Sequence, residues 1–228
     1  MAHSIISPAI LYWGTPVVLV SSENEDSSFN VCAISSAFWL SHRCVLGFGR
    51  GSKTPQNILR TGHCTVNLPD DSPHLVAAVN ALATTTGTAE PSQSKLSRGY
   101  RYVKDKWTVA NLTPQMSDFV PPPRIQECPV QMECELATSH PLMEDLPDLA
   151  GAIVLLELKV LRVHVHNDLR MKGFANRIDP DKWRPMIMSF QELYGLKAGK
   201  LGFSQLAEID EEKYRPFSRT CTSMTNQT

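Results

Sequence analysis

A β-rich α+β fold with peripheral helices is predicted by three features of the sequence. Residues 16–22 (PVVLVSS) and 44–48 (CVLGF) are apolar runs too short for three helical turns, which is typical of strands. Residues 152–166 form a longer apolar run that ends in alternating apolar and polar side chains. Helix signals are few and short, as in residues 72–82, where a cap serine precedes proline. With 228 residues, of which 42% are hydrophobic, we expect one domain with a real core.

The charge pattern argues against nucleic-acid and membrane partners. The formal net charge is −1, and Lys and Arg are scattered, so no basic stripe forms. No apolar run approaches the length of a membrane-spanning helix. The first basic residue is Arg43, so the N-terminus lacks the basic region of a signal peptide. We therefore expect a cytoplasmic protein.

No metal site is expected from the cysteines and histidines. The six cysteines show neither a CxxC pair nor a Cys/His ligand spacing, so they are interpreted as reduced, mostly buried thiols. His164 and His166 share one face of the predicted long strand with Arg162. An arginine disfavours a cation there, so this face is interpreted as a solvated one.

The most informative stretch is residues 30–67, which predicts strand, turn, strand, polar loop, short helix and strand. The loop at residues 49–55 combines two glycines and two hydroxyl residues with the cations Arg50 and Lys53, which is an inventory suited to phosphate. Thr54 and Pro55 predict a helix N-terminus, which would add free amides to the same place. The alternative is an ordinary capped and solvated loop, because the GxxxxGK[ST] spacing is absent.

The strand predicted at residues 30–39 mixes small and hydroxyl side chains with bulky ones. Its backbone is therefore open to close approach from Ala33 to Ala37, where a flat ring could lie.

The ordered segments TPVVLVSS, NVCAISSAFW, RGSKTPQNILRTG and CTVNLP resemble the flavin-reductase-like family, whose fold is the FMN-binding split β-barrel, a Greek-key-like arrangement. The match is strongest over residues 15–69 and continues more loosely through residues 124–129 and 160–166. The resemblance implies that the flavin ring and ribityl chain are held by Ala33, Ile34, Ser35 and Ser36. It implies that the phosphate is held by Arg50, Ser52, Lys53 and Thr54.

The resemblance also implies a cofactor, a partner and a reaction. The cofactor is FMN, with FAD as the alternative, and NAD(P)H is the implied co-substrate that reduces flavin or a small acceptor. Members that use NAD(P)H often carry Gly-Asp-His at the start of the long late strand, whereas this chain has Gly151, Ala152 and Ile153. Two other functions stay open: a specialised small-molecule enzyme with flavin as a redox or vestigial cofactor, and a non-catalytic flavin-binding module. A homodimer is expected.

The expected domain boundaries follow from the same pattern. Residues 1–14 are an N-terminal lead-in, residues 15–216 are the split-barrel domain, and residues 217–228 are a polar tail expected to be disordered. A proline-rich connection at residues 111–129 is expected to cross the surface. The candidate substrate pocket beside the flavin is formed by Phe38, Trp39, Phe119 and Arg124.

Overall fold

The computed structural model describes residues 3–197, 199–202 and 204–214 of the chain. Its main body is a seven-stranded sheet in which every neighbouring pair is antiparallel, in the order β3-β2-β6-β11-β12-β5-β4. Its strands are β2 (Val18–Glu23), β3 (Phe29–Ile34), β4 (Ala37–Leu40), β5 (Arg43–Gly49), β6 (His63–Leu68), β11 (Val130–Leu142) and β12 (Ile153–Val165). The predicted β-rich class is confirmed.

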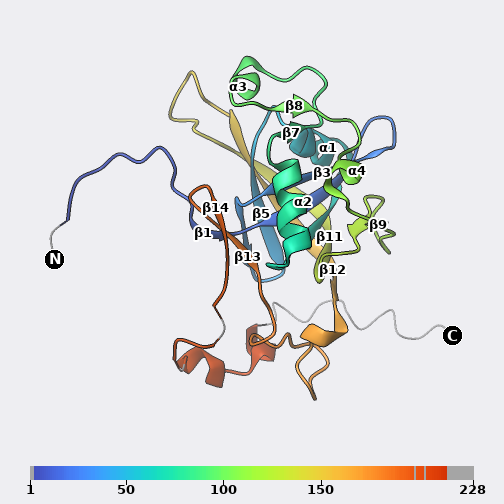
Figure 1. Ribbon diagram of the computed structural model, residues 1–228, viewed down its shortest axis with the longest axis vertical. Coiled ribbons are helices and arrows are strands. Elements are labelled where there is room, and N and C mark those ends of the chain that lie inside the picture. Colours follow the sequence, from blue (N-terminus) through green and yellow to red (C-terminus); the bar gives the residue numbers. More distant parts are fainter. Residues whose placement is uncertain (1–2, 198, 203, 215–228) are drawn as a thin grey trace.

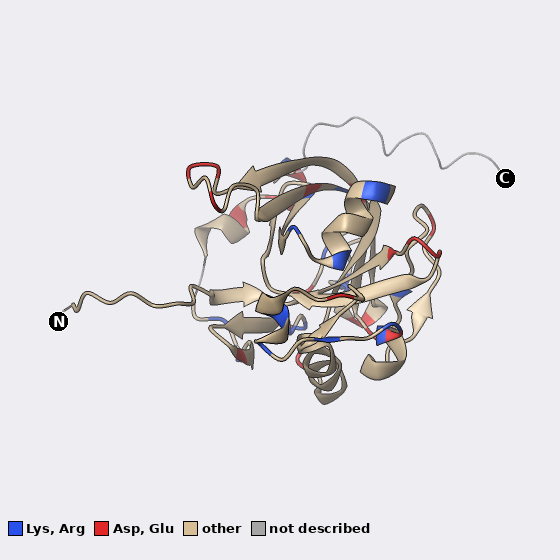
Figure 2. Ribbon diagram, turned by 90° about the horizontal axis from the view of Figure 1, so that it is seen from above, with Lys and Arg blue, Asp and Glu red and all other residues tan. Residues whose placement is uncertain are grey.

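The sheet must close on itself because of the way β3 leads into β4. These strands are the two edges of the seven-stranded sheet, yet only Ser35 and Ser36 separate them in the chain. Two extended residues span at most about 7 Å. The edges can meet at this corner only if the sheet curls into a barrel, and the curvature is visible from above in Figure 2. No ladder joins β3 to β4, so the barrel is open along this seam.

Alternation along the strands fills two cores. Val18 and Val20 of β2 point into the barrel, where they join apolar residues of β5, β6, β11 and β12. Leu19, between them, points outward into a second core under helices α2 (Pro73–Ala83) and α4 (Lys106–Ala110). Figure 1 shows α2 lying across the outside of the sheet. The period of two therefore gives β2 two buried faces.

Short elements complete the described chain. Strand β1 (Trp13–Pro16) pairs with β13 (Met186–Ser189), which pairs with β14 (Glu192–Gly195). The remaining helices are α1 (Lys53–Thr61), α3 (Gln93–Leu96) and the 3-10 turns η1 (Asn167–Leu169), η2 (Gln205–Glu208) and η3 (Glu211–Tyr214). The remaining strands are β7 (Thr85–Thr86), β8 (Arg101–Tyr102), β9 (Pro114–Gln115) and β10 (Arg124–Ile125). No described helix is long and apolar enough to cross a membrane.

Three local expectations are corrected. Residues 30–39 form not one strand but β3 and β4, because the chain turns the barrel corner at Ser35 and Ser36. Helix α1 begins one residue after Ser52, so Ser52 and not Thr54 is its N-cap, and Pro55 lies within the first turn. The expected lead-in extends into the fold, because Trp13 already belongs to β1. The expected disordered tail lies outside the described residues.

Candidate functional site

A cavity of about 820 Å³ lies at the open seam of the barrel. It is bounded by the β3–β4 corner, β5, the start of α1 and the segment from Thr85 to Tyr100. Its volume falls within the range of about 300 to 1,000 Å³ that is usual for small-molecule sites. The same corner that closes the barrel therefore also shapes one wall of the cavity.

One end of the cavity has small side chains and an approachable backbone. The four residues at the β3–β4 corner that the resemblance assigns to the flavin ring, Ala33, Ile34, Ser35 and Ser36, all line it. The Gly47 amide of β5 donates to the Ser36 carbonyl oxygen over 2.8 Å. A Cβ atom at Gly47 would lie 3.1 Å from the Ser36 Cβ, so glycine keeps this wall close and flat. The Leu155 side chain lies beside the same wall, and Phe48 and Ile153 also line the cavity.

The other end of the cavity receives the N-terminus of α1. Ser52 lines the cavity, and its side chain makes no capping hydrogen bond to the first turn. The first amides of the helix, together with the serine hydroxyl, are therefore available to an anion. The Thr54 hydroxyl is already engaged, since it accepts from Asn30 Nδ2 at 2.9 Å and donates to Cys32 Sγ at 3.0 Å. The Thr54 hydroxyl proton is therefore not free for a ligand, and Thr54 contributes mainly to the shape of this end of the cavity.

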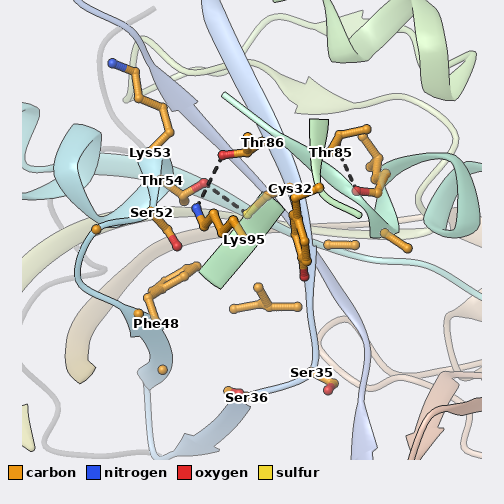
Figure 3. Close-up of a pocket in the computed structure, with 18 of the residues that line it drawn as sticks. Cys32, Ser35, Ser36, Phe48, Ser52, Lys53, Thr54, Thr85, Thr86 and Lys95 are labelled. Carbon is orange, nitrogen blue, oxygen red and sulfur yellow. Dashed lines mark hydrogen bonds between the residues drawn. The ribbon is translucent and has the colours of Figure 1, made fainter. Parts of the chain in front are cut away.

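Three cations line this end that the sequence reasoning did not single out: Lys95, Arg98 and Lys106. Figure 3 shows Lys95 reaching towards Ser52 and Thr54, and its ammonium lies 3.3 Å from Thr86 Oγ1. Burial lowers the pKa of Lys95, and the nearby Arg98 charge lowers it further. The three cations lie 40 to 51 positions beyond Pro55, the last residue of the phosphate-like loop, so no local motif in the sequence could have indicated them.

Lys106 is the most unusual of these cations. Its residue is only 3% exposed, and none of the hydrogen bonds or ion pairs of the described chain involves its ammonium. Burial is the main cause that lowers its pKa; the Cys32 thiol opposes this effect, and the Lys95 charge adds to it. No Asp or Glu is among the residues lining the cavity, all of which lie in the described chain. A charge buried without a counter-ion is costly, so this end of the cavity is suited to an anionic ligand.

Lys53 lies at the edge of the cavity but faces outward. Its ammonium is 2.5 Å from Glu25 Oε2, and Figure 3 shows the side chain pointing away from Ser52. The turn between β2 and β3 therefore contacts the edge of the cavity through Glu25. The other predicted phosphate cation, Arg50, is exposed and does not line the cavity.

The four predicted substrate-pocket residues lie outside the cavity. Phe38 is exposed, and Trp39 packs against the barrel core. The Phe119 ring lies 4.2 Å from the Arg162 guanidinium carbon. Arg124 is buried and donates to the Met116 carbonyl oxygen and to Gln131 Oε1.

The strand face expected to be solvated instead carries a buried carboxylate. Glu133 is fully buried; its carboxylate accepts the amides of Asp118 and Phe119 and lies 2.7 Å from His164 Nε2. Burial alone would raise the pKa of Glu133, but these partners outweigh it and lower the pKa. We name Asp118, Glu133, Arg162 and His164 the carboxylate clamp, because it fixes the proline-rich connection to β11 and β12.

The carboxylate clamp contains a group that could hold a metal, since ligand atoms of Asp118, Glu133 and His164 lie within 4.8 Å of one another. However, the Arg162 guanidinium pairs with Asp118, and the Glu133 carboxylate is already satisfied. The arrangement is explained by these hydrogen bonds alone, and nothing in it requires an ion.

Comparison with known proteins connects the fold and cavity to a family. The family model described as "Flavin reductase like domain" matches residues 12–194. An uncharacterized protein of Bacillus subtilis (strain 168), YdfE, is 34% identical over 191 residues, which cover 84% of this chain and 88% of that protein.

Solved structures share the fold at lower identity. Flavoredoxin of Desulfovibrio vulgaris (Miyazaki F) aligns with a TM-score of 0.69 at 20% identity, covering 92% of this chain and all of that one. Nitrilotriacetate monooxygenase component B from Bacillus cereus aligns with a TM-score of 0.64 at 24% identity, covering 82% and 87%. These likenesses confirm the expected split-barrel fold.

Proposed function

Because the chain belongs to the flavin reductase-like family, we propose that it is an oxidoreductase that holds FMN in the cavity at the barrel seam. The flavin ring would lie against the backbone of Ala33 to Ser36. The phosphate would lie at the N-terminus of α1, within reach of Ser52, Lys95 and Lys106. Reducing equivalents would come from NAD(P)H and pass to free flavin or a small acceptor.

The observation that carries this proposal is the two-sided character of the cavity. Its corner end is flat and largely apolar, and its α1 end is cationic and contains the buried, unpaired Lys106. FMN has the same two-sided character, with a flat ring and a phosphate at opposite ends. A flat apolar ligand without a phosphate would leave the Lys106 ammonium without a counter-ion.

The residues of the chain would bind, orient and shield rather than transfer protons. A bound flavin itself supplies the hydride and electron-transfer chemistry. The amides and the free Ser52 hydroxyl at the start of α1 would fix the phosphate, and the Gly47 wall would fix the plane of the ring. Phe48 and Leu155 would exclude water from one side of the ring. The lack of an acid–base pair in the cavity is therefore compatible with an enzyme.

A second function, a non-catalytic flavin-binding module, is favoured by one feature. Ile153 lines the cavity at the place where the resemblance aligns the histidine of members that use NAD(P)H. An aliphatic side chain offers no imidazole to orient a nicotinamide. This module would bind FMN in the same way but would not be reduced by either nicotinamide.

The two functions are separated by anaerobic reduction. Purified protein with stoichiometric FMN is mixed with NADH or NADPH, and the flavin absorbance is followed, with FMN alone as the control. Bleaching faster than in the control supports the oxidoreductase. Flavin that binds but stays oxidised with both nicotinamides rejects the reductase and leaves the binding module.

We also propose that the protein forms a homodimer. The surface sheet of β1, β13 and β14 exposes aromatic side chains, with Trp13 and Phe190 in edge-to-face contact at a centroid distance of 4.8 Å. Tyr194 of β14 is also more than half exposed. Exposed aromatic residues of this kind are enriched in protein interfaces. Light scattering would test this directly, since the chain mass is 25.4 kDa.

A further inference from the structure

Residues 87–99 leave the body of the protein at the α1 end of the cavity and return to it. Strand β7 leads into this excursion and strand β8 follows it, and the two strands pair in parallel. The four-residue helix α3 lies within it, and Figure 1 shows α3 at the outer edge of the molecule, beyond β7 and β8. We name residues 87–99 the strap. Four of its residues line the cavity: Gly87, Ser92, Lys95 and Arg98.

The strap is held to the rest of the protein mainly at its two ends. None of residues 88–99 is buried, and Leu96 on α3 is 47% exposed. Within the described chain, the hydrogen bonds of these residues are either internal or reach only Thr86 and Tyr100, which flank the strap. A segment with so few buried contacts opens locally at a low free energy. The strap can therefore open while the barrel stays folded.

The two ends of the strap are glycines with different surroundings. A Cβ atom at Gly87 would lie 2.6 Å from Asn30 Oδ1 and 3.1 Å from Lys53 Cγ, so this end is pressed against β3 and α1. Gly99 has a φ of +81° and no atom within 4 Å of an added Cβ. Glycine adopts this left-handed conformation without steric cost, and other residues do not. Gly87 therefore fixes one end of the strap, and Gly99 lets the other end turn.

Like charges oppose this position of the strap when no anion is bound. Lys95 on the strap and Lys106 beneath it are both cations, and after burial the Lys95 charge is a further cause that lowers the pKa of Lys106. An anion between the two ammonium groups would replace this repulsion by attraction to both. Figure 3 shows Lys95 reaching towards Ser52 at the start of α1, where the proposed phosphate lies. The position described here is therefore the one that a bound phosphate stabilises.

We propose that the strap is a phosphate-operated gate, which closes over the α1 end of the cavity when a phosphate lies between Lys95 and Lys106 and opens about Gly99 when the phosphate is absent. This inference rests on the proposed flavin site, because the phosphate of FMN is the closing anion. Reduction of the flavin ring leaves the phosphate unchanged, so the gate stays closed in both redox states. FMN is then a resident cofactor, and electrons leave the cavity while the flavin stays.

Limited trypsin digestion of the full-length protein measures the opening, because cleavage after Lys95 requires the strap to unfold locally. FMN at 100 times its Kd should slow this cleavage at least about tenfold, since a ligand that binds only the closed form slows it by up to about 100-fold. Riboflavin at the same saturation should slow it less than twofold, because it lacks the phosphate. Cleavage after Lys172, on an exposed loop outside the cavity, is the internal control and should respond to neither flavin.

Gly99→Ala tests the hinge without changing a residue that lines the cavity. Alanine disfavours the left-handed backbone of the closed strap, so FMN should dissociate about 5- to 30-fold faster in stopped-flow measurements. Dissociation of riboflavin should change less than twofold. Gly173→Ala is the matched control, since Gly173 has a φ of +86° and equally free space for a Cβ atom, but lies outside the strap.

The other outcomes separate the gate from the flavin site. Equal protection by FMN and riboflavin, or no protection although FMN binds, overturns the gate and leaves the flavin site standing. Dissociation of FMN that is unchanged in Gly99→Ala, or that changes by the same factor as that of riboflavin, also overturns the gate. Absence of FMN binding in a titration of the wild-type protein rejects the flavin site itself.

Discussion

The Lys106 ammonium lies where a charge destabilises the ligand-free protein. The residue is buried, has no acidic partner among the described residues, and lines a cavity that Lys95 and Arg98 also line. Such a charge is retained at a cost when a ligand supplies its counter-ion. The same residue is therefore expected to weaken the empty protein and to strengthen the complex.

Lys106→Met tests both halves of this expectation. Methionine keeps most of the length of the side chain without the charge, so the free energy of unfolding of the ligand-free protein should rise by about 1–3 kcal/mol. FMN affinity should fall by about 10- to 100-fold, because one charge-assisted contact is lost. Urea unfolding and FMN titration measure the two quantities. Lys104→Met is the control, since Lys104 is exposed and pairs with Asp26 outside the cavity. An unchanged FMN affinity in Lys106→Met would contradict a role of Lys106 in binding the phosphate.

The lowered pKa of Lys106 also predicts a pH dependence. Consider the pH range between this lowered pKa and the ordinary pKa of 10.5. In this range the Lys106 amine is deprotonated in the empty folded protein, whereas it stays protonated in the unfolded chain and in the phosphate complex. Binding of FMN then takes up a proton, so FMN affinity should fall as the pH rises through this window. By the same linkage, the free energy of unfolding of the ligand-free protein should rise with pH in this range, because the unfolded chain binds the proton more strongly. Parallel FMN titrations of the wild type and Lys106→Met check this, and an identical pH slope in both would count against it.

At the scale of elements, the carboxylate clamp holds the proline-rich connection to the barrel. The buried Glu133 carboxylate on β11 satisfies two amides of that connection, and His164 on β12 lies against the same carboxylate. The connection has little regular structure besides the two-residue strands β9 and β10. Its position therefore depends on these side-chain contacts more than on a ladder.

Glu133→Gln is expected to lower the free energy of unfolding by about 2–3 kcal/mol, because hydrogen bonds to a buried charge are replaced by weaker ones. The lowered pKa of Glu133 means that its contribution is present above its ordinary pKa of 4.5 and is lost as the pH falls through the lowered value. The difference between variant and wild type should therefore shrink below about pH 4. Glu135→Gln, on the exposed part of the same strand, is the control and should lower the free energy of unfolding by less than about 1 kcal/mol. An equally small decrease for Glu133→Gln would contradict the role given to the carboxylate clamp.

A substitution at Gly47 on β5 tests whether the flat wall at the β3–β4 corner of the cavity holds the flavin ring. A Cβ atom there would lie 3.1 Å from Ser36 Cβ and 3.5 Å from Leu155 Cδ2, so Gly47→Val should push the β3–β4 corner away. Affinity for riboflavin and for FMN should fall by the same factor, on the order of tenfold, because the ring end is changed and the phosphate end is not. Gly202→Val, at a position outside the cavity with no atom within 4 Å of an added Cβ, is the control. A loss confined to FMN would place the ring elsewhere.

The elements were predictable from sequence where local chemistry determines them. The runs PVVLVSS and CVLGF gave strands, and Ser72 with Pro73 gave the start of α2. The N-cap of α1 was misplaced because Thr54 before Pro55 is an equally good local signal, whereas Lys53 and Thr54 already belong to the helix. The break at Ser35 and Ser36 was missed because it is imposed by barrel closure and not by any turn residue.

At the scale of the whole molecule, the site is a product of topology. The corner residues come from β3 and the two residues after it, the proposed phosphate end from α1, and the additional cations from the segment that runs from α3 into α4. The first two were predictable because they are adjacent in the sequence. Lys95, Arg98 and Lys106 were not, since only the packing of α4 and the segment from Thr85 to Tyr100 against β3 and α1 brings them there. The ion pair of Lys53 was not predictable for the same reason, because its partner Glu25 lies in another turn.

The proposed homodimer can be tested by a substitution on the exposed β1-β13-β14 sheet. Trp13→Glu should convert a protein of twice the chain mass into one of 25.4 kDa in light scattering, because a charge would replace an exposed aromatic ring of the β1-β13-β14 sheet. Tyr214→Glu is the control, at an exposed aromatic residue outside this sheet. A wild-type protein that is monomeric at all concentrations measured would contradict the dimer.

We propose that one cavity holds a flavin with its ring at the barrel corner and its phosphate at the start of α1. Equilibrium titration of the wild-type protein with riboflavin and with FMN separates the two ends of the cavity, because the two ligands share the ring and differ only in the phosphate. We predict that both bind and that FMN binds at least about tenfold more tightly, as expected for charge-assisted phosphate contacts. Equal affinities, or no binding of either flavin, would contradict the account.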